Sequence, residues 1–398
     1  MEKALYLVMV DPTANNNKYY RMIPKGNMFE VQYGRVGNTN YATDSYPISM
    51  WNKKLNEKLK KGYVDQTRLV ATYVDKKSGV EYSSISNASI ASIVNRLQSM
   101  AKQAIEDNYT ISANKVTQTM IDEAQSLISQ LTSAQDTNQF NIVLVDLFRT
   151  IPRRMARVSD ELAHSTGSFN NIIRKEQDLL DVMRGQVAQQ EIVDEPEITT
   201  VQSQTILDKL GLQFSEITST DKEVILAKLE KLSDKFSNAW KVVNTKTQTQ
   251  FDAFVTEQNI NNKKLLWHGS RNENWWSIIN SGLVLRPNAI TTGSMFGYGI
   301  YFAPLAQKSF GYTSYNGSYW AGGRSNTAFM SLFNVAYGKP YDVYSHSNNV
   351  GNMTYDLLQR VANGSHCVHA HAGNMLRNDE IVVYKESQIT IQYLVELK

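Results

Sequence analysis

A histidine, a tyrosine between two glycines, and several hydroxyl and aromatic side chains are concentrated between residues 265 and 312. His268 follows the apolar run Leu-Leu-Trp, which predicts a short buried strand, and stands directly before Gly269. Further on, the run Gly297-Tyr-Gly299 lets the backbone turn tightly or approach a ligand closely. These groups could hold a ligand against the backbone. Taken alone, however, a histidine at a strand end is more often a satisfied core residue, so the surrounding segments must decide.

The elements around these residues are predicted to be strands with few helices. A helix is expected over 274–280, because Trp275, Ile278 and Ile279 fall at i, i+3 and i+4, and Gly282 is expected to end it. The C-terminal segment 389–397 alternates apolar and polar residues, as a half-buried strand should. Strands are predicted at 300–302, 329–336, 380–384 and 389–397, with mixed helix and strand segments at 202–210, 221–232 and 237–243. This pattern predicts antiparallel sheets, and it contains no glycine-rich dinucleotide fingerprint.

Several runs in this region follow a known family signature in the same order and with nearly the same spacing. They are Leu265-Leu-Trp-His-Gly-Ser-Arg271, Gly282-Leu283, Pro287, Met295-Phe-Gly-Tyr-Gly-Ile-Tyr-Phe-Ala303, Lys308-Ser-Phe-Gly-Tyr312 and Asn378-Asp-Glu-Ile-Val-Val-Tyr384. Together they resemble the signature of the poly(ADP-ribose) polymerases, a family of NAD-consuming ADP-ribosyltransferases. The resemblance implies an antiparallel β-rich ADP-ribosyltransferase domain over 200–398, with NAD as the co-substrate.

The resemblance assigns the catalytic set to His268, Tyr301 and Glu380, from three separated strands. The reaction breaks the bond from nicotinamide to ribose, and positive charge develops on the sugar. A carboxylate beside that ribose, here Glu380, would stabilise the charge, bond a ribose hydroxyl and polarise the attacking acceptor as a base. Asp379 is adjacent but is expected on the opposite face of the strand. The alternative for Glu380 is a solvated glutamate at a strand start.

The resemblance also assigns the residues that would bind NAD. His268 would bond a hydroxyl of the adenosine ribose, Tyr301 would form one wall of the nicotinamide pocket, and Tyr312 would stack on the nicotinamide ring. The carboxamide would be held by the Gly269 backbone and the Ser309 hydroxyl. The adenosine side would be shaped by Ser270 and Arg271.

Two departures from the family pattern concern the product. Tyr298 stands where many of these polymerases have lysine, which could alter acceptor polarisation or chain elongation. The stretch between Gly338 and Glu380 is shorter than in many members, so loops on the acceptor side are expected to be trimmed. The retained Glu380 favours a polymer-forming enzyme, because mono-transferring relatives often lack it.

Residues 1–85 predict a small antiparallel sheet with one helix. Strands are expected over 5–10, 19–23, 28–33 and 41–45, and a helix over 48–61. The run Phe29-Glu-Val-Gln-Tyr-Gly-Arg-Val-Gly37 resembles the WGR domain, which in the polymerases binds DNA ends, although Tyr33 replaces its tryptophan. Tyr33 could stack on a base or sugar and Arg35 could meet a phosphate. The alternative is a packed aromatic and a structural arginine in a protein-interaction module.

Residues 86–190 predict amphipathic helices and hence an all-α bundle. Apolar faces appear over 90–104 and 120–131, an apolar helix over 140–148 is stopped by Ile151-Pro152, and a helix over 172–183 is expected to end at Arg184-Gly185. The block resembles the regulatory helical domain of the DNA-dependent polymerases. By that resemblance it would block NAD access until DNA binding destabilises it. The alternative is a passive spacer. The acidic, proline-broken run 191–197 is the nearest thing to a linker.

The run His366-Cys-Val-His-Ala-His371 holds three of the six histidines and the only cysteine. Imidazole and thiolate are good metal ligands, but strand alternation is expected to place these residues on two faces. We therefore expect no metal.

Composition bounds the class of protein. The 398 residues suffice for two or three domains, and no apolar run reaches the length of a membrane span. A strand-like N-terminus without a cleavage site argues against a signal peptide, and the single Cys367 excludes a disulfide framework. The net charge of +3 is uneven, since residues 1–85 carry about +5, which suggests a polyanion contact. An intracellular protein is expected: nuclear in a eukaryote, cytoplasmic or nucleoid-associated in a prokaryote or virus.

The first hypothesis is thus an α+β multidomain protein: a WGR-like domain over 1–85, a helical regulatory domain over 86–190 and the transferase over 200–398. It would transfer ADP-ribose from NAD to protein acceptors, itself included, elongate chains and respond to DNA ends or breaks. One alternative is a DNA-end-binding scaffold with weak or no transferase activity. Another is a DNA-independent mono-ADP-ribosyltransferase, suggested by Tyr33 and Tyr298.

Overall fold

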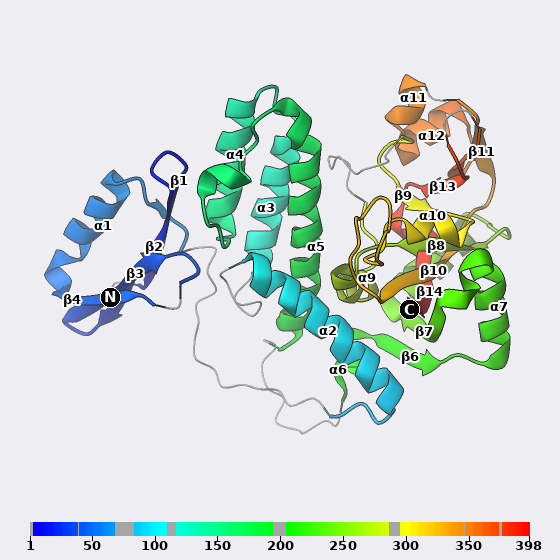
Figure 1. Cartoon of the computed structure of the whole chain (residues 1–398), viewed down its shortest axis with the longest axis horizontal. Helices are drawn as coiled ribbons and strands as arrows, with labels where there is room; N and C mark the ends of the chain where they lie inside the picture. The colour runs from blue at the N-terminus through cyan, green and yellow to red at the C-terminus, as the bar shows by residue number, and fades with distance from the viewer. Residues whose placement is uncertain are drawn as a thin grey trace. The chain divides into compact units, whose positions relative to one another are not determined.

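The computed structural model describes residues 3–38, 40–67, 83–109, 117–193, 204–285, 295–345, 347–373 and 376–398 (Figure 1). Pro287 and most of the predicted linker lie outside these ranges. The chain forms two compact units, one of Met1–Gly79 with Lys102–Val187 and one of Val80–Ala101 with Ala188–Lys398. Within the described ranges, no helix is both long and apolar enough to span a membrane.

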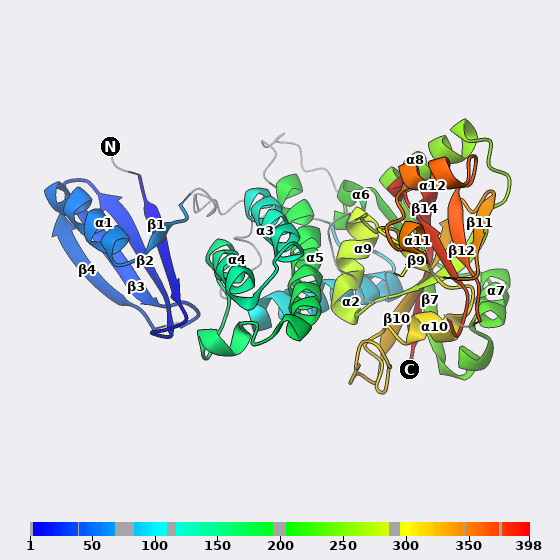
Figure 2. The same ribbon diagram turned by 90° about the horizontal axis from the view of Figure 1, so that it is seen from above.

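The first unit begins with the predicted antiparallel sheet, in the strand order β4-β3-β2-β1-β5. Its elements are β1 (Leu5–Asp11), β2 (Asn16–Lys25), β3 (Met28–Arg35), β4 (Ala42–Pro47), η1 (Ile48–Met50), α1 (Trp51–Lys60) and β5 (Val64–Asp65). Helix α1 crosses one face of this sheet (Figure 2), where Trp51 buries its ring against Phe29 at a centroid distance of 5.1 Å. Alternating apolar residues of β1 to β3, such as Leu7, Met22 and Val31, complete this core.

The same unit contains helices and short 3-10 turns. They are the end of α2 (Ala88–Asn108), then α3 (Gln118–Leu131), α4 (Thr137–Thr150), η3 (Val158–Glu161), η4 (Thr166–Ser168) and α5 (Phe169–Val193), which belongs to this unit as far as Val187. Thr117 and Asp136 cap the starts of α3 and α4 by accepting from backbone N–H groups, and α4 stops before Ile151-Pro152 as predicted.

The predicted end of the last helix at Arg184-Gly185 is wrong, because α5 continues to Val193. Gly185 is not among the glycines with a positive φ, so it keeps a helical conformation instead of turning the chain. A glycine inside a helix costs about 1 kcal/mol relative to alanine, which a long helix tolerates.

The second unit contains two sheets, in the orders β6-β7-β14-β10-β8 and β11-β12-β13-β9. Their strands are β6 (Leu212–Glu216), β7 (Phe236–Asn244), β8 (Lys264–Gly269), β9 (Ile300–Phe302), β10 (Ala328–Val335), β11 (Pro340–Val343), β12 (Cys367–Ala370), β13 (Glu380–Val383) and β14 (Ile389–Leu397). Pairing is antiparallel as predicted, except that β11 and β12 are parallel. A bridge between Trp267 and Ala303 joins β8 to the end of β9.

Short helices surround these sheets. They are α6 (Ile206–Leu210), α7 (Ser219–Leu229), η5 (Glu230–Lys235), α8 (Thr245–Glu257), η6 (Asn272–Asn274), α9 (Trp275–Ser281), α10 (Ala306–Phe310), α11 (Asn348–Gly351), α12 (Tyr355–Val361) and η7 (Glu386–Gln388). Helix α9 and its end before Gly282 were predicted, whereas the sequence reading did not identify β6 or α8.

Strand β14 was expected to be half-buried, and this is wrong: only Gln392 is partly exposed, and the other residues of the strand are buried. The strand lies between β7 and β10, so both of its edges are paired. Even Glu396 is buried, and it accepts a hydrogen bond of 2.8 Å from Arg96 of α2. The strand is therefore the centre of the second unit's larger sheet.

The first part of α2 belongs to this second unit. Besides the Arg96 ion pair, Ser89 accepts a hydrogen bond from the Trp240 indole at 3.2 Å, and Asn87 donates to Glu216 at 3.2 Å. The segment predicted as one helical block over 86–190 thus contributes residues to both compact units.

Candidate active site

The imidazole of His268 is oriented by a backbone group of the neighbouring strand. Its Nδ1 lies 3.0 Å from the carbonyl oxygen of Tyr301. A carbonyl oxygen can only accept, so Nδ1 carries the proton and donates. Burial lowers the pKa of His268, against the opposing effect of this hydrogen bond, so the ring is neutral at pH 7. Nε2 then carries a lone pair that can accept a hydrogen bond from a ligand hydroxyl.

Gly269 is needed because the backbone of α10 approaches it closely. A Cβ at this position would lie 1.9 Å from the carbonyl oxygen of Ser309. The buried hydroxyl of Ser309 donates to the carbonyl oxygen of Trp267 at 3.1 Å. The structure therefore brings Gly269 and Ser309 together, and the Ser309 oxygen keeps lone pairs that can accept.

Tyr301 is held at both sides of its hydroxyl by the loop that precedes it. The hydroxyl donates to the carbonyl oxygen of Gly297 at 2.8 Å and accepts from the N–H of Phe296 at 3.0 Å. Gly297 has a φ of +79°, and a Cβ there would lie 2.3 Å from backbone atoms of Met353. Of the two options that the sequence left open at Gly297, a tight turn or a close approach to a ligand, the described residues show a turn packed against protein backbone.

Glu380 is a buried carboxylate at the start of β13. Its Oε1 lies 2.6 Å from the ammonium of Lys308, whereas its Oε2 is buried and has no hydrogen-bond partner among the described residues. Burial raises the pKa of the Glu380 carboxyl, and the hydrogen bond and charge of Lys308 oppose that rise. An unpartnered buried carboxylate oxygen needs an explanation, and a ligand hydroxyl is one.

Lys308 is a site residue for which the sequence predicted no role. It was part of the quoted Lys308-to-Tyr312 run, but its partner Glu380 lies far away in the sequence. The two residues come together because β9, which precedes the helix with Lys308, pairs with β13, which begins at Glu380. In that pairing Tyr301 lies opposite Val382.

Tyr301, Tyr312 and Glu380 share one electrostatic environment. Val382 lies opposite Tyr301 and is two residues from Glu380, so Tyr301 and Glu380 lie on the same face of the sheet. Burial raises the pKa of Tyr312 to about 12, and the charge of Glu380 adds to that shift. The same charge contributes to the raised pKa of Tyr301, after burial. One face of the Tyr312 ring stacks on Trp320 at a centroid distance of 6.1 Å.

The two predicted adenosine-side residues lie just after β8. Ser270 accepts a hydrogen bond of 3.0 Å from the side chain of Asn274, and Arg271 precedes the turn η6 and is partly buried. Both residues come immediately after the strand that carries His268 in the chain.

The two predicted DNA-binding residues lie in β3 of the N-terminal sheet (β1 to β5), called the front sheet below, and both have protein partners. The Tyr33 hydroxyl donates to Asp44 at 3.1 Å, and its ring lies 5.9 Å from that of Tyr20. The guanidinium of Arg35 donates to the carbonyl oxygens of Asn15, Met155 and Ala156 at 2.9, 3.1 and 2.9 Å. These contacts are those of a structural arginine, which was the alternative to a DNA contact for Arg35.

The chain matches two family models and several known proteins. The model of the poly(ADP-ribose) polymerase catalytic domain matches residues 219–398, and that of the WGR domain matches residues 3–69. The chain is 30% identical over 191 residues to uncharacterized protein 101L of Invertebrate iridescent virus 6, which covers 47% of this chain and 79% of that protein. It is 28% identical over 186 residues to the putative poly [ADP-ribose] polymerase-like 100L of the same virus, covering 46% of this chain and 97% of the relative.

The chain is also similar to a human protein. The chain is 28% identical over 185 residues to poly [ADP-ribose] polymerase 2 of Homo sapiens, covering 38% of this chain and 31% of that protein. The two matched domains and these relatives agree with the family that the motifs of the sequence indicated. The chain belongs to the poly(ADP-ribose) polymerase family of NAD-dependent ADP-ribosyltransferases, with a WGR domain and a catalytic domain.

Proposed function

We propose that this chain cleaves NAD between nicotinamide and ribose and transfers the ADP-ribose to protein acceptors, itself included. The observation that carries the proposal is the buried carboxylate of Glu380. One of its oxygens is paired with Lys308, and the other has no partner among the described residues. An enzyme that must stabilise positive charge on a sugar needs such a preorganised anion.

The residues around Glu380 fit NAD as the substrate. The Nε2 lone pair of His268 would accept from a hydroxyl of the adenosine ribose. The Gly269 backbone and the Ser309 oxygen would bind the carboxamide, with Ser309 accepting because its own proton goes to Trp267. The fixed ring of Tyr301 would form a wall of the nicotinamide pocket, and the free face of Tyr312 would stack on the nicotinamide.

Glu380 would act in its ionised form. Its unpartnered Oε2 would accept from a ribose hydroxyl, and its charge would stabilise the positive charge that develops on the sugar as nicotinamide leaves. The carboxylate would also accept the proton of the attacking acceptor. Lys308 favours the charged form of the carboxylate, because its ammonium opposes the rise in the pKa that burial causes.

Chain elongation is proposed on the basis of the retained Glu380, and one observation favours the mono-transferring alternative. Tyr298, where many relatives have lysine, is 39% exposed, and its side chain offers a neutral hydroxyl in place of a cation. Electrophoresis of the automodified protein separates the two, since polymers smear and single additions do not.

Activation by DNA ends is the second part of the proposal. The WGR domain suggests nucleic-acid binding, and the positive charge of residues 1–85 supports it. Arg35 ties the front sheet to the segment after α4, which leads into a buried ion pair between Arg153 and Glu176 at 2.6 Å. We propose that DNA loosens the helices through this connection and so relieves inhibition of the catalytic unit.

Nicotinamide release from NAD, with and without nicked or blunt DNA duplexes, tests both parts. Strong stimulation by DNA is expected. High turnover without DNA would retain the transferase and discard the switch. DNA binding without any turnover would favour the scaffold alternative. The intracellular location stays a prediction.

A further inference from the structure

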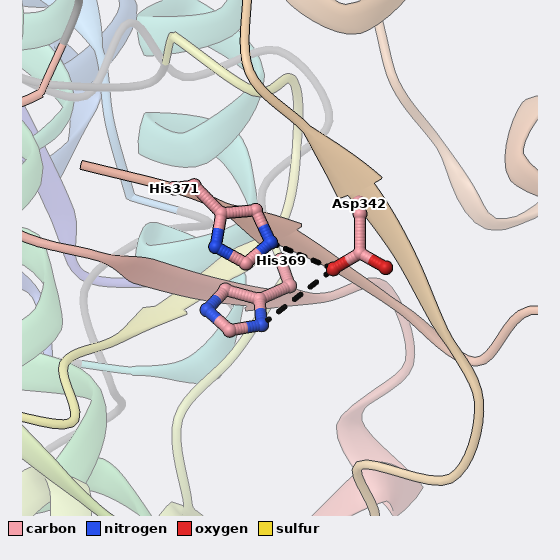
Figure 3. Close-up of side chains that lie close together, drawn as sticks. All are labelled: Asp342, His369 and His371. Carbon is pink, nitrogen blue, oxygen red and sulfur yellow. Dashed lines mark hydrogen bonds and ion pairs between the residues drawn. The ribbon is translucent and has the colours of Figure 1, made fainter. Parts of the chain in front are cut away.

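Asp342, His369 and His371 form a cluster in the smaller sheet of the catalytic unit. Their potential ligand atoms all lie within 4.8 Å of one another. Figure 3 shows both imidazole rings turned towards the same oxygen of Asp342. The cluster lies among described residues that no step of the transferase proposal uses.

Strand pairing explains why the cluster was not expected from the sequence. Alternation separates His366 from the other two histidines, and the Nδ1 of His366 accepts instead from the N–H of Lys339. His369 and His371 are two residues apart and so share a face. The parallel pairing of β11 with β12 places Asp342 opposite His369. The expectation that the histidine run is divided between two faces thus holds only for His366.

The distances are close to those of a metal site. Asp342 Oδ1 lies 2.7 Å from Nε2 of His371 and 3.8 Å from Nδ1 of His369. The two imidazole rings are stacked at a centroid distance of 3.9 Å. In a tetrahedral zinc site, with bonds of about 2.0 Å, the ligand atoms lie about 3.3 Å apart. Side-chain adjustments of about 1 Å would therefore suffice to reach that geometry.

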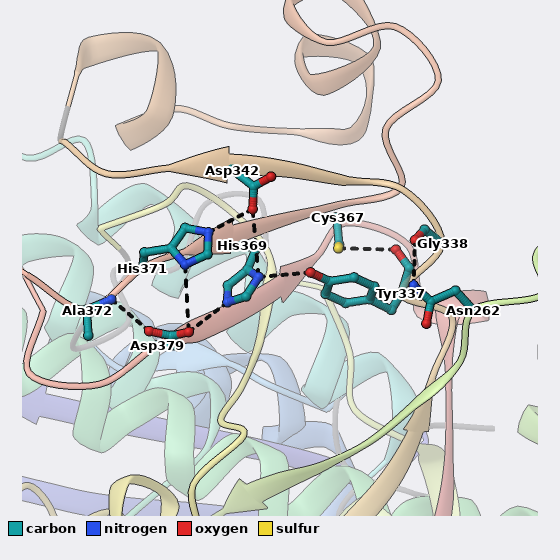
Figure 4. Close-up of polar contacts among 9 residues, drawn as sticks. All are labelled: Asn262, Tyr337, Gly338, Asp342, Cys367, His369, His371, Ala372 and Asp379. Carbon is teal, nitrogen blue, oxygen red and sulfur yellow. Dashed lines mark hydrogen bonds and ion pairs between the residues drawn. The ribbon is translucent and has the colours of Figure 1, made fainter.

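A second carboxylate orients the rings from the other side (Figure 4). Asp379 Oδ2 lies 2.9 Å from Nε2 of His369 and 3.8 Å from Nδ1 of His371, and Oδ1 accepts from the N–H of Ala372 at 2.7 Å. Because the Asp379 carboxylate accepts from Nε2 of His369, the other nitrogen of that ring keeps its lone pair. Metal-bound histidines usually donate their second N–H to a carboxylate in this way.

We propose that Asp342, His369 and His371 bind one divalent transition-metal ion of the zinc type. The ligand atoms are an Asp342 carboxylate oxygen, His369 Nδ1 and His371 Nε2, with water completing the coordination. Imidazole and carboxylate ligands suit such ions, and the two aspartates supply the negative charge that balances the cation. On binding, the ion takes the place of the proton on His371 Nε2, and the neutral ring keeps its proton on Nδ1, which lies 3.8 Å from Asp379 Oδ2.

The ion would be structural with respect to the transferase site. In the β12–β13 pairing Ala370 lies opposite Glu380 and His369 lies opposite Ile381, so the cluster and Glu380 are on opposite faces of the sheet. The expectation that Asp379 points away from the Glu380 face is confirmed by its bond to His369. A bound ion would join β11 to β12 and the residue after it. The hydrogen bond from His369 to Asp379 would connect the ion to the residue just before the strand that carries Glu380.

Tyr337 is the group that must yield to the ion. Its hydroxyl lies 2.8 Å from His369 Nδ1 and donates to the lone pair that the metal would use. Removing that hydroxyl by Tyr337→Phe keeps the ring and removes the competing hydrogen bond. The proposal therefore predicts that Tyr337→Phe binds the ion at least as tightly as the wild type.

The test is calorimetric titration of Zn²⁺ into the full-length, untagged chain after treatment with a chelator. One ion per chain is expected, with affinity at least tenfold lower in Asp342→Asn and in His371→Gln. The matched controls His366→Gln and His164→Gln should bind as the wild type does. Zinc should also raise the thermal unfolding midpoint of the wild type and of Tyr337→Phe, but not that of Asp342→Asn.

Three results would contradict the zinc site, provided that the variants fold. Asp342 and His371 have side chains that are 46% and 23% exposed, so their variants should fold, and unfolding midpoints without zinc check this. Wild-type chain that binds no zinc, or binds it equally after His371→Gln, contradicts the site. X-ray absorption of the loaded chain should show nitrogen and oxygen ligands only. A sulfur ligand would instead implicate Cys367, whose thiol donates to the carbonyl of Tyr337.

Discussion

The ammonium of Lys308 lies 2.6 Å from Oε1 of Glu380 and also donates to the carbonyl oxygen of Asn378 at 3.0 Å. The two charged side chains are only 13% and 9% exposed, so solvent screens their attraction weakly. One oxygen of the carboxylate is thus fixed by the lysine, and the other remains for a ligand. This division of the two oxygens is the basis of the predictions for the active site.

Replacing Lys308 by methionine should move the acidic limb of the pH–rate profile to higher pH. Burial raises the pKa of Glu380 and Lys308 opposes that rise, so removing the ammonium lets the pKa increase further. The carboxyl is then protonated, and inactive, up to a higher pH. The measurement is kcat/KM for nicotinamide release between about pH 5 and 9. Lys308→Arg, which keeps the charge, is the control, and an unmoved limb in Lys308→Met would refute the role of the ion pair.

Truncating His268 to alanine should weaken NAD binding more than it slows turnover. The loss of one hydrogen bond of about 0.5–1.5 kcal/mol corresponds to a rise in Kd of about 2- to 13-fold. Calorimetry with NAD measures it, and the exposed His164→Ala serves as the control. Because burial lowers the pKa of His268, wild-type binding should stay constant from neutral pH down to pH 6.5. An unchanged Kd in His268→Ala would remove this residue from the site.

Glu176→Gln should raise DNA-independent turnover if the helices inhibit the catalytic unit. The Arg153–Glu176 pair is buried on both sides, and breaking it leaves an uncompensated charge at a cost of about 3–5 kcal/mol. The control is Glu161→Gln, because its ion pair with Lys175 is exposed and contributes about 0–1 kcal/mol. Nicotinamide release without DNA is compared with the unfolding midpoint of each variant. A lowered midpoint without a rise in basal release would exclude autoinhibition.

This substitution is preferable to deleting residues 86–190. A deletion would remove Ser89 and Arg96, which bond to Trp240 and Glu396 of the catalytic unit. Loss of activity would then reflect damage to the β-sheet rather than the absence of a switch.

Arg35→Ala should uncouple DNA binding from turnover. The guanidinium donates to Met155 and Ala156, so its loss should reduce DNA stimulation and lower stability by about 1–3 kcal/mol. Fluorescence anisotropy at several salt concentrations distinguishes this role from a phosphate contact. A phosphate contact predicts that the salt slope of DNA affinity falls by about 1, whereas the positioning role predicts an unchanged slope. The matched variant Tyr33→Ala tests stacking on DNA.

Local patterns predicted the elements whose signals are local. The strand before His268, the helix that ends at Gly282, the strand with Tyr301 and the small front sheet all follow from apolar periodicity and turn residues. The end of α5 was misplaced, because a glycine in a helix differs from a glycine after a helix only in its backbone conformation. The burial of β14 on both faces depends on what packs against the sheet, such as Ile225 of α7, which shares a core with Tyr393 and Val395. Alternation within one strand does not encode those contacts.

The site was predictable only as far as motifs extend. The resemblance supplied Glu380 and His268, but not the partner of Glu380, because the Lys308 pairing spans segments that only the fold joins. The same limit applies to Asp342, which reaches His369 through a parallel strand pair that the antiparallel expectation excluded.

Nicotinamide release by the wild type and by Glu380→Gln, measured side by side with NAD and DNA duplexes, tests the central claim most directly. The amide keeps the shape of the side chain but removes its charge. Losing one preorganised group of this kind typically lowers turnover by about 10²- to 10³-fold. The account predicts such a loss with NAD affinity changed by less than about threefold. Equal turnover in the two proteins would contradict the assignment of Glu380 as the catalytic carboxylate.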